Sequence, residues 1–242
     1  MISYLFNTFF YQPLFNGLIF LYNIVPGHDM GISIIILTIL IRLIIWPLTG
    51  KGIKNQRALS KIQPQIDEVK RKFKDNKEGQ AKALMALYSE NKISPFAGLL
   101  PIIIQLPIIF ALWRVFLNSV NLDLNSLYSF VPAPVAVQSV FLGLFDLSQR
   151  SVVLAIISGV LLYLQTKMIM PSYAKVPEGK SSGSSDFGRM MAKQMLYLGP
   201  IISIVVFWSL PAALPLYWIV VTLSTILQQY LNQNNGREIN KN

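Results

Sequence analysis

Three kinds of residue are scarce in this chain of 242 residues, and each shortage excludes a class of function. Cysteine is absent, which rules out disulfides, thiolate metal sites, thiol catalysis and a lipid-modified N-terminal cysteine. His28 is the single histidine, so a metal site built from several histidines is excluded as well. Charged residues make up only 13%, about half the share of an ordinary soluble domain. The composition therefore disfavours a soluble enzyme.

Apolar residues dominate instead, at 53% of the chain, and they fall into long runs. A membrane-spanning helix needs roughly 20 mostly apolar residues. Five runs approach or reach that length: 31–48, 96–118, 152–170, 195–210 and 216–231. Pro211 and Pro215 mark the turn between the last two. The sequence predicts an all-α integral membrane protein with five transmembrane helices.

Residues 1–30 are also apolar and rich in aromatic side chains, but polar residues recur among them at helical spacing. This predicts one narrow wet stripe on an amphipathic helix in the outer membrane interface. A sixth span and a signal peptide are the alternatives. No cation precedes Arg42, which disfavours a signal peptide. The stripe consists of Thr8, Gln12, Asn16 and Asn23.

Lysine and arginine are distributed unequally between the segments that join the runs. Segment 51–95 holds eleven, 171–194 holds four and 232–242 holds two, whereas 1–30 holds none and 119–151 holds only Arg150. Cytoplasmic segments carry the excess of cations in membrane proteins. We therefore expect the N-terminus and the loop 119–151 outside, and the segments 51–95, 171–194 and 232–242 in the cytoplasm.

Segment 51–95 has the pattern of a helical hairpin, because two apolar stripes at helical spacing flank a break near Asn76. Its charges are explained either as a solvated face or as a surface that docks anionic lipid headgroups or a partner. DNA binding is disfavoured, since acids interrupt the cations and aromatic stacking partners are lacking. Contact with ribosomal RNA stays open. The stripes are Ile62, Ile66, Val69 and Phe73, then Leu84, Leu87 and Tyr88.

Arg42 lies inside the first apolar run, where a cation costs roughly 2.5 to 3.5 kcal/mol on insertion scales. No Asp or Glu occurs in any of the five runs, so no ion-pair partner is available there. One interpretation is that Arg42 reaches back to cytoplasmic phosphates. Neutral polar residues suggest instead either interhelical hydrogen bonds or a shared hydrated cavity. They include Thr38, one turn from Arg42 on the same span, and Gln105, Gln165 and Trp218 on other spans.

No constellation for catalysis is found in these runs: His28 lies outside the first run, and paired acids are missing. We therefore expect no enzyme activity, no metal site and no cofactor.

At these residues the chain resembles the YidC/Oxa/Alb family of membrane protein insertases, from about Tyr11 to Tyr230. The resemblance implies five spans, an outer amphipathic helix, a cytoplasmic helical hairpin and a hydrophilic groove with Arg42 as its positive residue. Thr38, Gln105, Gln165 and Trp218 are the other candidate groove residues. Seven collinear pieces carry the resemblance: YQPLFNGLIFLYNIVPG, GISIIILTILIRLIIWPLT, IQPQIDEVKRKFKDN, ALYSENKISPFAGLLPIIIQLPIIFALWRVF, FLGLFDLS, YLQTKMIMP and LPAALPLYWIVVTLSTILQQYL.

What the resemblance implies about function is an insertase and chaperone for nascent membrane proteins, in a short form of the family, in the bacterial inner (plasma) membrane. Its partners would be nascent membrane proteins and the lipid bilayer, with the ribosome, a targeting receptor and the Sec translocon as further candidates. Two other classes remain open on the residues alone. They are a small-solute transporter or channel with an arginine-lined site, and a structural assembly scaffold.

Overall fold

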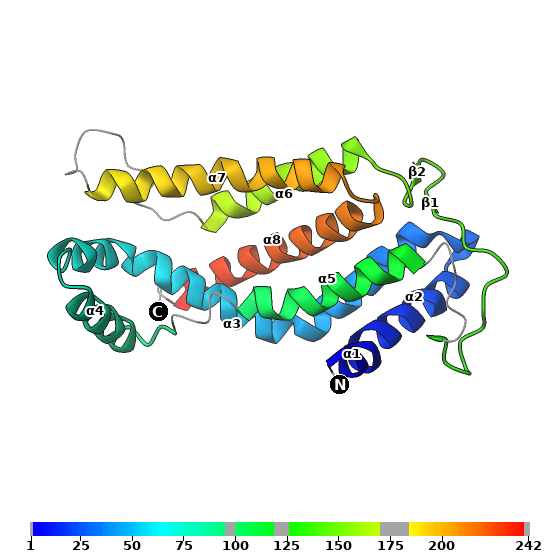
Figure 1. Ribbon diagram of the computed structural model, residues 1–242, viewed down its shortest axis with the longest axis horizontal. Helices are drawn as coiled ribbons and strands as arrows, with labels where there is room; N and C mark the ends of the chain where they lie inside the picture. The colour runs from blue at the N-terminus through cyan, green and yellow to red at the C-terminus, as the bar shows by residue number, and fades with distance from the viewer. Residues whose placement is uncertain (1, 95–99, 119–125, 170–183, 240–242) are drawn as a thin grey trace.

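The computed structural model describes residues 2–94, 100–118, 126–169 and 184–239. The chain is mostly helical (Figure 1). Helices α3, α5, α6, α7 and α8 run along the long axis, with α4 at one end and the strands β1 and β2 at the other. Helix α8 is central, because it packs against α3, α5 and α6. The four later helices are α5 (Leu100–Asn118), α6 (Val152–Ile169), α7 (Ser184–Trp208) and α8 (Ala213–Ile239).

The N-terminal segment is helical from Ile2 to Ile24, in three parts: α1 (Ile2–Phe6), the π-helix η1 (Asn7–Tyr11) and α2 (Gln12–Ile24). A short 3-10 turn, η2 (Pro26–His28), follows. One face of this segment is buried against α3 and α5 and gives Tyr11, Phe15, Leu18 and Ile19 to the main core.

One residue of the polar stripe that was predicted to be wet, Asn16, is buried instead. Asn16 is only 3% exposed. Its Nδ2 donates to the carbonyl of Ser126 at 2.8 Å, and its Oδ1 accepts from the Tyr128 amide at 2.7 Å. Asn23 Nδ2 donates to the carbonyl of Pro132 at 2.8 Å. Asn16 and Asn23 thus hold an irregular segment of chain. The backbone groups of such a segment need hydrogen-bond partners that a helix would supply internally.

Helix α3 (Met30–Lys72) begins at Asp29, whose Oδ1 accepts from the Ile32 amide at 3.0 Å. It continues through Pro47 and Pro64 without ending, although we expected separate elements at 31–48 and 51–95. The apolar run ends at Leu48. An apolar run ends where the chain leaves the hydrocarbon, whereas the backbone hydrogen bonds of a helix can continue in water. The end of the apolar run and the end of the helix therefore differ.

Helix α4 (Lys77–Glu90) turns back along the end of α3. Asn76 caps it, with Oδ1 accepting from the Gly79 amide at 2.8 Å. The two helices share a small apolar core of their own, separate from the main core. Its members are Ile62, Ile66 and Ile93, with Ala58, Leu59, Leu84, Leu87 and Tyr88 packed on them.

Two helical stretches within the described residues are long and apolar enough to cross a membrane by length and composition, Met30–Lys72 and Ala213–Asn232. Three shorter apolar stretches accompany them: Gln105–Phe116, Val152–Met168 and Leu196–Trp208. A mostly helical protein with membrane-spanning segments therefore agrees with the expected class. The number of five spans stays a prediction.

Strands occur at the end opposite α4, where only helices and loop were expected. β1 (Val140–Phe141) pairs with β2 (Phe145–Asp146) in an antiparallel hairpin. Leu142 and Gly143 make the turn with positive φ angles of 51° and 70°. The carboxylate of Asp146 in β2 accepts hydrogen bonds, and these hold the pKa of Asp146 below its usual value. The largest contribution comes from the Ser148 hydroxyl, followed by the Ser148 amide, the Ser139 hydroxyl and the Gln149 amide. Four residues of strand are too few for a periodic sequence signal.

The ends of α7 and α8 also differ from expectation. Helix α7 begins at Ser184, within the expected loop 171–194, and α8 runs to Ile239, within the expected tail 232–242. Good helix formers (Arg, Met, Ala, Lys and Gln) fill residues 189–194 of α7, so the helix extends beyond its apolar part. Parts of the predicted segments lie outside the described residues: 1, 95–99, 119–125, 170–183 and 240–242.

Candidate functional site

Helix α3 carries two of the predicted site residues one turn apart, Thr38 and Arg42. Thr38 is 2% exposed, and its hydroxyl donates to the carbonyl of Ile34 at 2.6 Å. This bond leaves the hydroxyl of Thr38 as an acceptor only. Arg42 is half-buried in the same helix. A helix spacing of four residues places both side chains on one face of α3.

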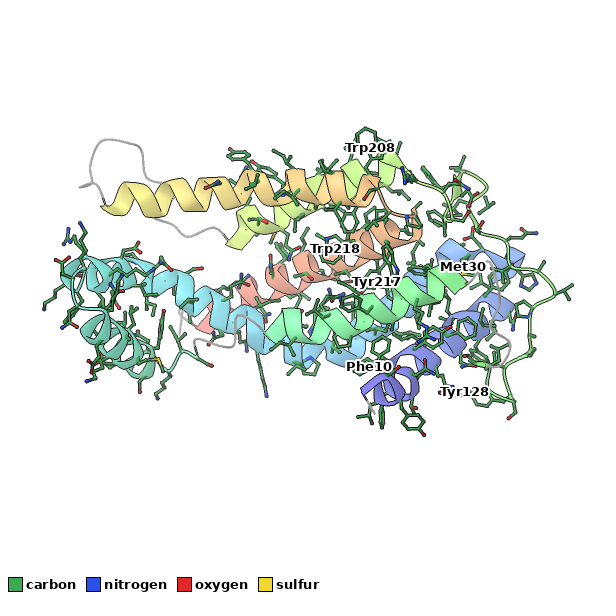
Figure 2. All side chains as sticks on the ribbon, in the orientation of Figure 1. Phe10, Met30, Tyr128, Trp208, Tyr217 and Trp218 are labelled. Carbon is green, nitrogen blue, oxygen red and sulfur yellow. The ribbon has the colours of Figure 1, made fainter. Side chains whose placement is uncertain are left out.

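A hydrogen-bonded network joins Arg42 to two other helices. Its Nη2 donates to Oε1 of Gln105 on α5 at 3.5 Å, a long and therefore weak bond. Gln105 Nε2 donates in turn to the hydroxyl of Tyr217 on α8. Tyr217 is 2% exposed and lies in the middle of the molecule (Figure 2). Three helices thus meet at one polar cluster inside an apolar bundle.

The partners of Arg42 in this cluster are neutral. Across the described part of the chain, the one ion pair within 4 Å joins Lys82 and Glu78 of α4. A guanidinium has five N–H donors, and the Gln105 bond uses one of them. Arg42 therefore keeps an uncompensated positive charge and spare donors, which is what an incoming carboxylate needs.

Trp218 follows Tyr217 in the chain but takes no part in this network. Its ring packs on Phe207 of α7, with centroids 5.4 Å apart. The indole Nε1 is buried and has no hydrogen-bond partner among the residues that the structure describes. The same holds for both side-chain amide atoms of Gln229, further along α8. Buried polar atoms without partners are uncommon and costly.

Gln165 is half-buried on α6, and no hydrogen bond joins it to the cluster within the described residues. Of the five predicted residues, the structure therefore links Arg42 and Gln105 directly and places Thr38 one turn away. Trp218 and Gln165 lie on the neighbouring helices α8 and α6.

Sequence reasoning missed Tyr217. The candidate residue predicted on this span is Trp218, and Tyr217 lies about 100° away from it around the helix. A hydroxyl within an apolar run was the available signal. Only the packing of α5 against α8 shows that this hydroxyl meets Gln105.

A second polar junction joins α3 and α8 nearer to α4. Gln228, 3% exposed, accepts from the Thr49 hydroxyl at 2.9 Å and donates to the carbonyl of Trp46 at 2.7 Å. Further along, Nη2 of Arg57 donates to the backbone carbonyl of Gln229. Partial burial lowers the pKa of Arg57 from its ordinary value. This junction was not predicted either.

A cavity of about 150 Å³ lies at the strand end of the molecule and includes none of the predicted site residues. Among the described residues, no group of three His, Asp or Glu side chains lies close enough together to hold a metal ion. The cavity is lined by Met30, Ile34, Phe116, Val137, Ser139, Leu147, Ser148 and Ala213.

Comparison with known proteins gives consistent similarities. A family model described as "60Kd inner membrane protein" matches residues 20–239. The "Membrane protein insertase YidC" of Fusobacterium nucleatum is 33% identical over 231 residues, which cover 95% of this chain and 99% of that protein. Proteins of the same name from Citrifermentans bemidjiense and Geotalea uraniireducens are 33% and 34% identical over 92% of this chain. The match covers only 36% and 37% of those two longer proteins.

Proposed function

Since the chain belongs to the YidC/Oxa family of membrane proteins, we propose that it inserts other membrane proteins into the lipid bilayer and helps them fold. The observation that carries the proposal is the cluster of Arg42, Gln105 and Tyr217, a cation with neutral partners inside an apolar bundle. A transmembrane segment crosses on its own by hydrophobic partitioning, but its polar flank does not. Arg42 would lower the cost for that flank.

The arrangement we propose has five spans, formed by the apolar parts of α3, α5, α6, α7 and α8. The N-terminal helix would lie in the outer interface, and α4 with the end of α3 would form a cytoplasmic hairpin. The excess of Lys and Arg in segments 51–95, 171–194 and 232–242 supports this orientation. Both the exposed aromatic side chains of the N-terminal segment, such as Tyr4 and Phe9, and its burial against α3 and α5 fit an interfacial position.

In the proposed mechanism, a hydrophilic groove between these spans receives the substrate's short outer segment. Arg42 attracts acidic residues of that segment, while Thr38, Gln105, Gln165 and Trp218 offer hydrogen bonds to its backbone. The unpartnered Trp218 Nε1 supports this role, because it is a buried donor in need of an acceptor. Burial of the substrate's apolar helix in lipid then drives the step to completion without a nucleotide or cofactor.

The partners that follow from this mechanism are nascent membrane proteins and the lipid bilayer. Delivery of a nascent chain also calls for the ribosome, a targeting receptor or the Sec translocon, and the cytoplasmic hairpin is the surface we assign to such contacts. No DNA contact and no catalytic reaction form part of the proposal.

The experiment that tests the proposal follows insertion of a single-span substrate with an acidic outer segment into vesicles that contain only this protein. We expect Arg42→Ala to slow insertion by about ten-fold, the factor that ~1.4 kcal/mol of lost attraction produces. Arg42→Lys retains the charge and should retain most of the activity. A substrate whose acids are changed to amides should lose most of its dependence on Arg42.

Leu43→Ala is the matched control, because Leu43 lies beside Arg42 in α3 but is 58% exposed on the apolar surface. It should insert substrate at the rate of the unmodified protein. Equal insertion by Arg42→Ala and the unmodified protein would refute the role of Arg42. Equal insertion by empty vesicles would refute the insertase function itself.

A further inference from the structure

The segment of α3 that follows the apolar run carries cations without any acid. Lys51 and Lys54 are exposed and Arg57 is half-buried. Their spacing of three residues places them within about 120° of one another around the helix. No Asp or Glu occurs between Asp29 and Asp67. This stretch of helix is therefore uniformly positive.

A fourth cation joins these three through the return of the chain from α4. Asn55 Nδ2 donates to the carbonyl of Ser94 at 2.9 Å, and Asn55 Oδ1 accepts from the Ser94 amide at 3.2 Å. This pair of bonds holds the chain after α4 beside Asn55. The exposed Lys92 precedes Ser94 by two residues in that chain. We call Lys51, Lys54, Arg57 and Lys92 the basic foot.

Arg57 is the fixed member of the basic foot. Its Nη2 donates to the carbonyl of Gln229 on α8, which ties the guanidinium to the helix bundle. That bond leaves four of its five N–H donors. No carboxylate lies within ion-pair distance of Arg57 among the residues that the structure describes. A planar guanidinium held in place and lacking an acid suits a phosphate.

The basic foot starts in the lipid headgroup layer and extends beyond it along α3. At 1.5 Å per residue, Lys51 lies about 4.5 Å and Arg57 about 13.5 Å beyond Leu48. Headgroups occupy roughly 5 to 8 Å on each side of the hydrocarbon core. Long Lys and Arg side chains extend several ångströms along the surface of a protein to reach such a layer.

The far end of the hairpin has a different charge pattern. Between residues 67 and 82 four acids accompany six cations, and Lys82 is paired with Glu78. Glu90 is the acid nearest to the basic foot along α4. The unbalanced charge is therefore concentrated where α3 leaves the proposed membrane, and Figure 1 shows α4 at the end of the molecule opposite the strands.

From this arrangement we infer that the basic foot binds the phosphates of anionic phospholipids in the cytoplasmic leaflet, with Arg57 as the anchored ligand. The inference rests on the membrane placement proposed above, but it does not depend on insertase activity. Bound lipid would hold the base of the hairpin at the membrane surface and leave its far end accessible to partners.

The test titrates the purified full-length protein, in a neutral detergent, with phosphatidylglycerol or phosphatidylcholine and counts bound lipids by native mass spectrometry. The foot variant is Lys51→Gln, Lys54→Gln, Lys92→Gln. The control is Lys70→Gln, Lys74→Gln, Lys77→Gln, which removes the same charge from exposed positions at the far end. All six lysines are exposed, so both variants should keep the melting temperature of the unmodified protein.

We expect the foot variant to bind phosphatidylglycerol at least ~10-fold more weakly, since each cation near an anionic surface contributes about five-fold. The control should change that affinity less than two-fold, and phosphatidylcholine should bind equally to all three proteins. Equal losses in both variants, or no loss in the foot variant, would overturn the inference. The inference would also be overturned if the basic foot were needed for ribosome binding in phosphatidylcholine nanodiscs but not for lipid binding. No substrate is present, so the result is independent of the proposed insertion activity.

Discussion

The guanidinium of Arg42 lies among neutral hydrogen-bonding groups, and this determines what it can attract. A carboxylate in place of Gln105 would neutralise the cation, whereas the amide only orients it at 3.5 Å. The hydroxyl of Tyr217 accepts from the same amide and so fixes which end of Gln105 faces Arg42. An ion pair between Arg42 and a carboxylate at position 105 would join the same helices but would leave Arg42 with no charge available to a substrate.

This argument predicts that Gln105→Glu impairs insertion, although the two side chains have nearly the same shape. The new carboxylate would pair with Arg42 and remove its attraction for an acidic substrate, which we expect to slow insertion by about ten-fold. Gln105→Leu removes the hydrogen bonds but not the charge and should have a smaller effect. Insertion into vesicles measures both. If Glu and Leu at this position have equal effects, the charge of Arg42 is not what the substrate recognises.

Gly31 lies where a larger residue has no room. A Cβ there would be 2.1 Å from Cδ2 of Phe141 and 2.7 Å from its Cβ. Gly31→Ala should therefore displace the β1–β2 hairpin and destabilise the protein by about 1–3 kcal/mol, the usual cost of overpacking. Unfolding in mixed micelles measures this cost. Gly199→Ala is the control, since nothing lies within 4 Å of its Cβ position.

The double variant Gly31→Ala, Phe141→Ala separates a local clash from a general effect. Because the shorter side chain removes most of the clash, the double variant should be at least ~0.5 kcal/mol more stable than the sum of the single effects predicts. Strict additivity would show that Gly31 is needed for another reason.

At the scale of elements, the junction between α3 and α8 connects the polar cluster to the hairpin. Helix α3 carries Arg42 and the first arm of the hairpin on one continuous helix. Pro47 lacks an amide hydrogen, so the helix is weakest there. Gln228 bridges this point, through Thr49 and the carbonyl of Trp46, and a Cβ on Gly50 would be 3.2 Å from its Nε2.

We therefore predict that Gln228→Leu loosens the hairpin more than it destabilises the fold. Interhelical hydrogen bonds in membranes contribute about 0.6 kcal/mol on average, so the loss of stability should be small. Spin labels on Met85→Cys and Tyr197→Cys, both at exposed positions, should show a broader distance distribution. Leu227→Ala is the control, because Leu227 is 52% exposed and outside the junction. An unchanged distribution would show that Gln228 does not fix the hairpin.

The helices could be predicted from the sequence more readily than their ends or their polar contacts. Apolar runs locate the interior of each helix, but α3 and α7 extend past these runs. A helix satisfies its own backbone hydrogen bonds both in lipid and in water, so it need not end where the apolar residues end. Asn16 was read as solvated because its spacing is helical, whereas it is buried against Ser126 and Tyr128. Arg42 was identifiable alone, because a cation in an apolar run is costly. Tyr217 and Gln228 were not, because their partners lie more than 100 residues away.

For the whole molecule, the charge bias that predicts its orientation can be tested directly, because the chain has no cysteine. A single introduced cysteine would then be the only thiol in the protein. Val135 lies on the segment expected outside, and Met85 lies on α4 in the expected cytoplasmic hairpin; both are exposed. Ile103, 62% exposed on the apolar surface of α5, is expected to face lipid.

In intact cells, we expect a membrane-impermeant maleimide to label Val135→Cys but not Met85→Cys, and permeabilised cells to give labelling of both. Ile103→Cys should stay unlabelled throughout, because a maleimide reacts with a thiolate and a thiol in hydrocarbon does not ionise. The opposite pattern for Val135 and Met85 would invert the protein in the membrane. It would also remove the basic foot from the cytoplasmic leaflet, where anionic lipids attract it, so the same measurement decides whether the proposed lipid site faces the right surface.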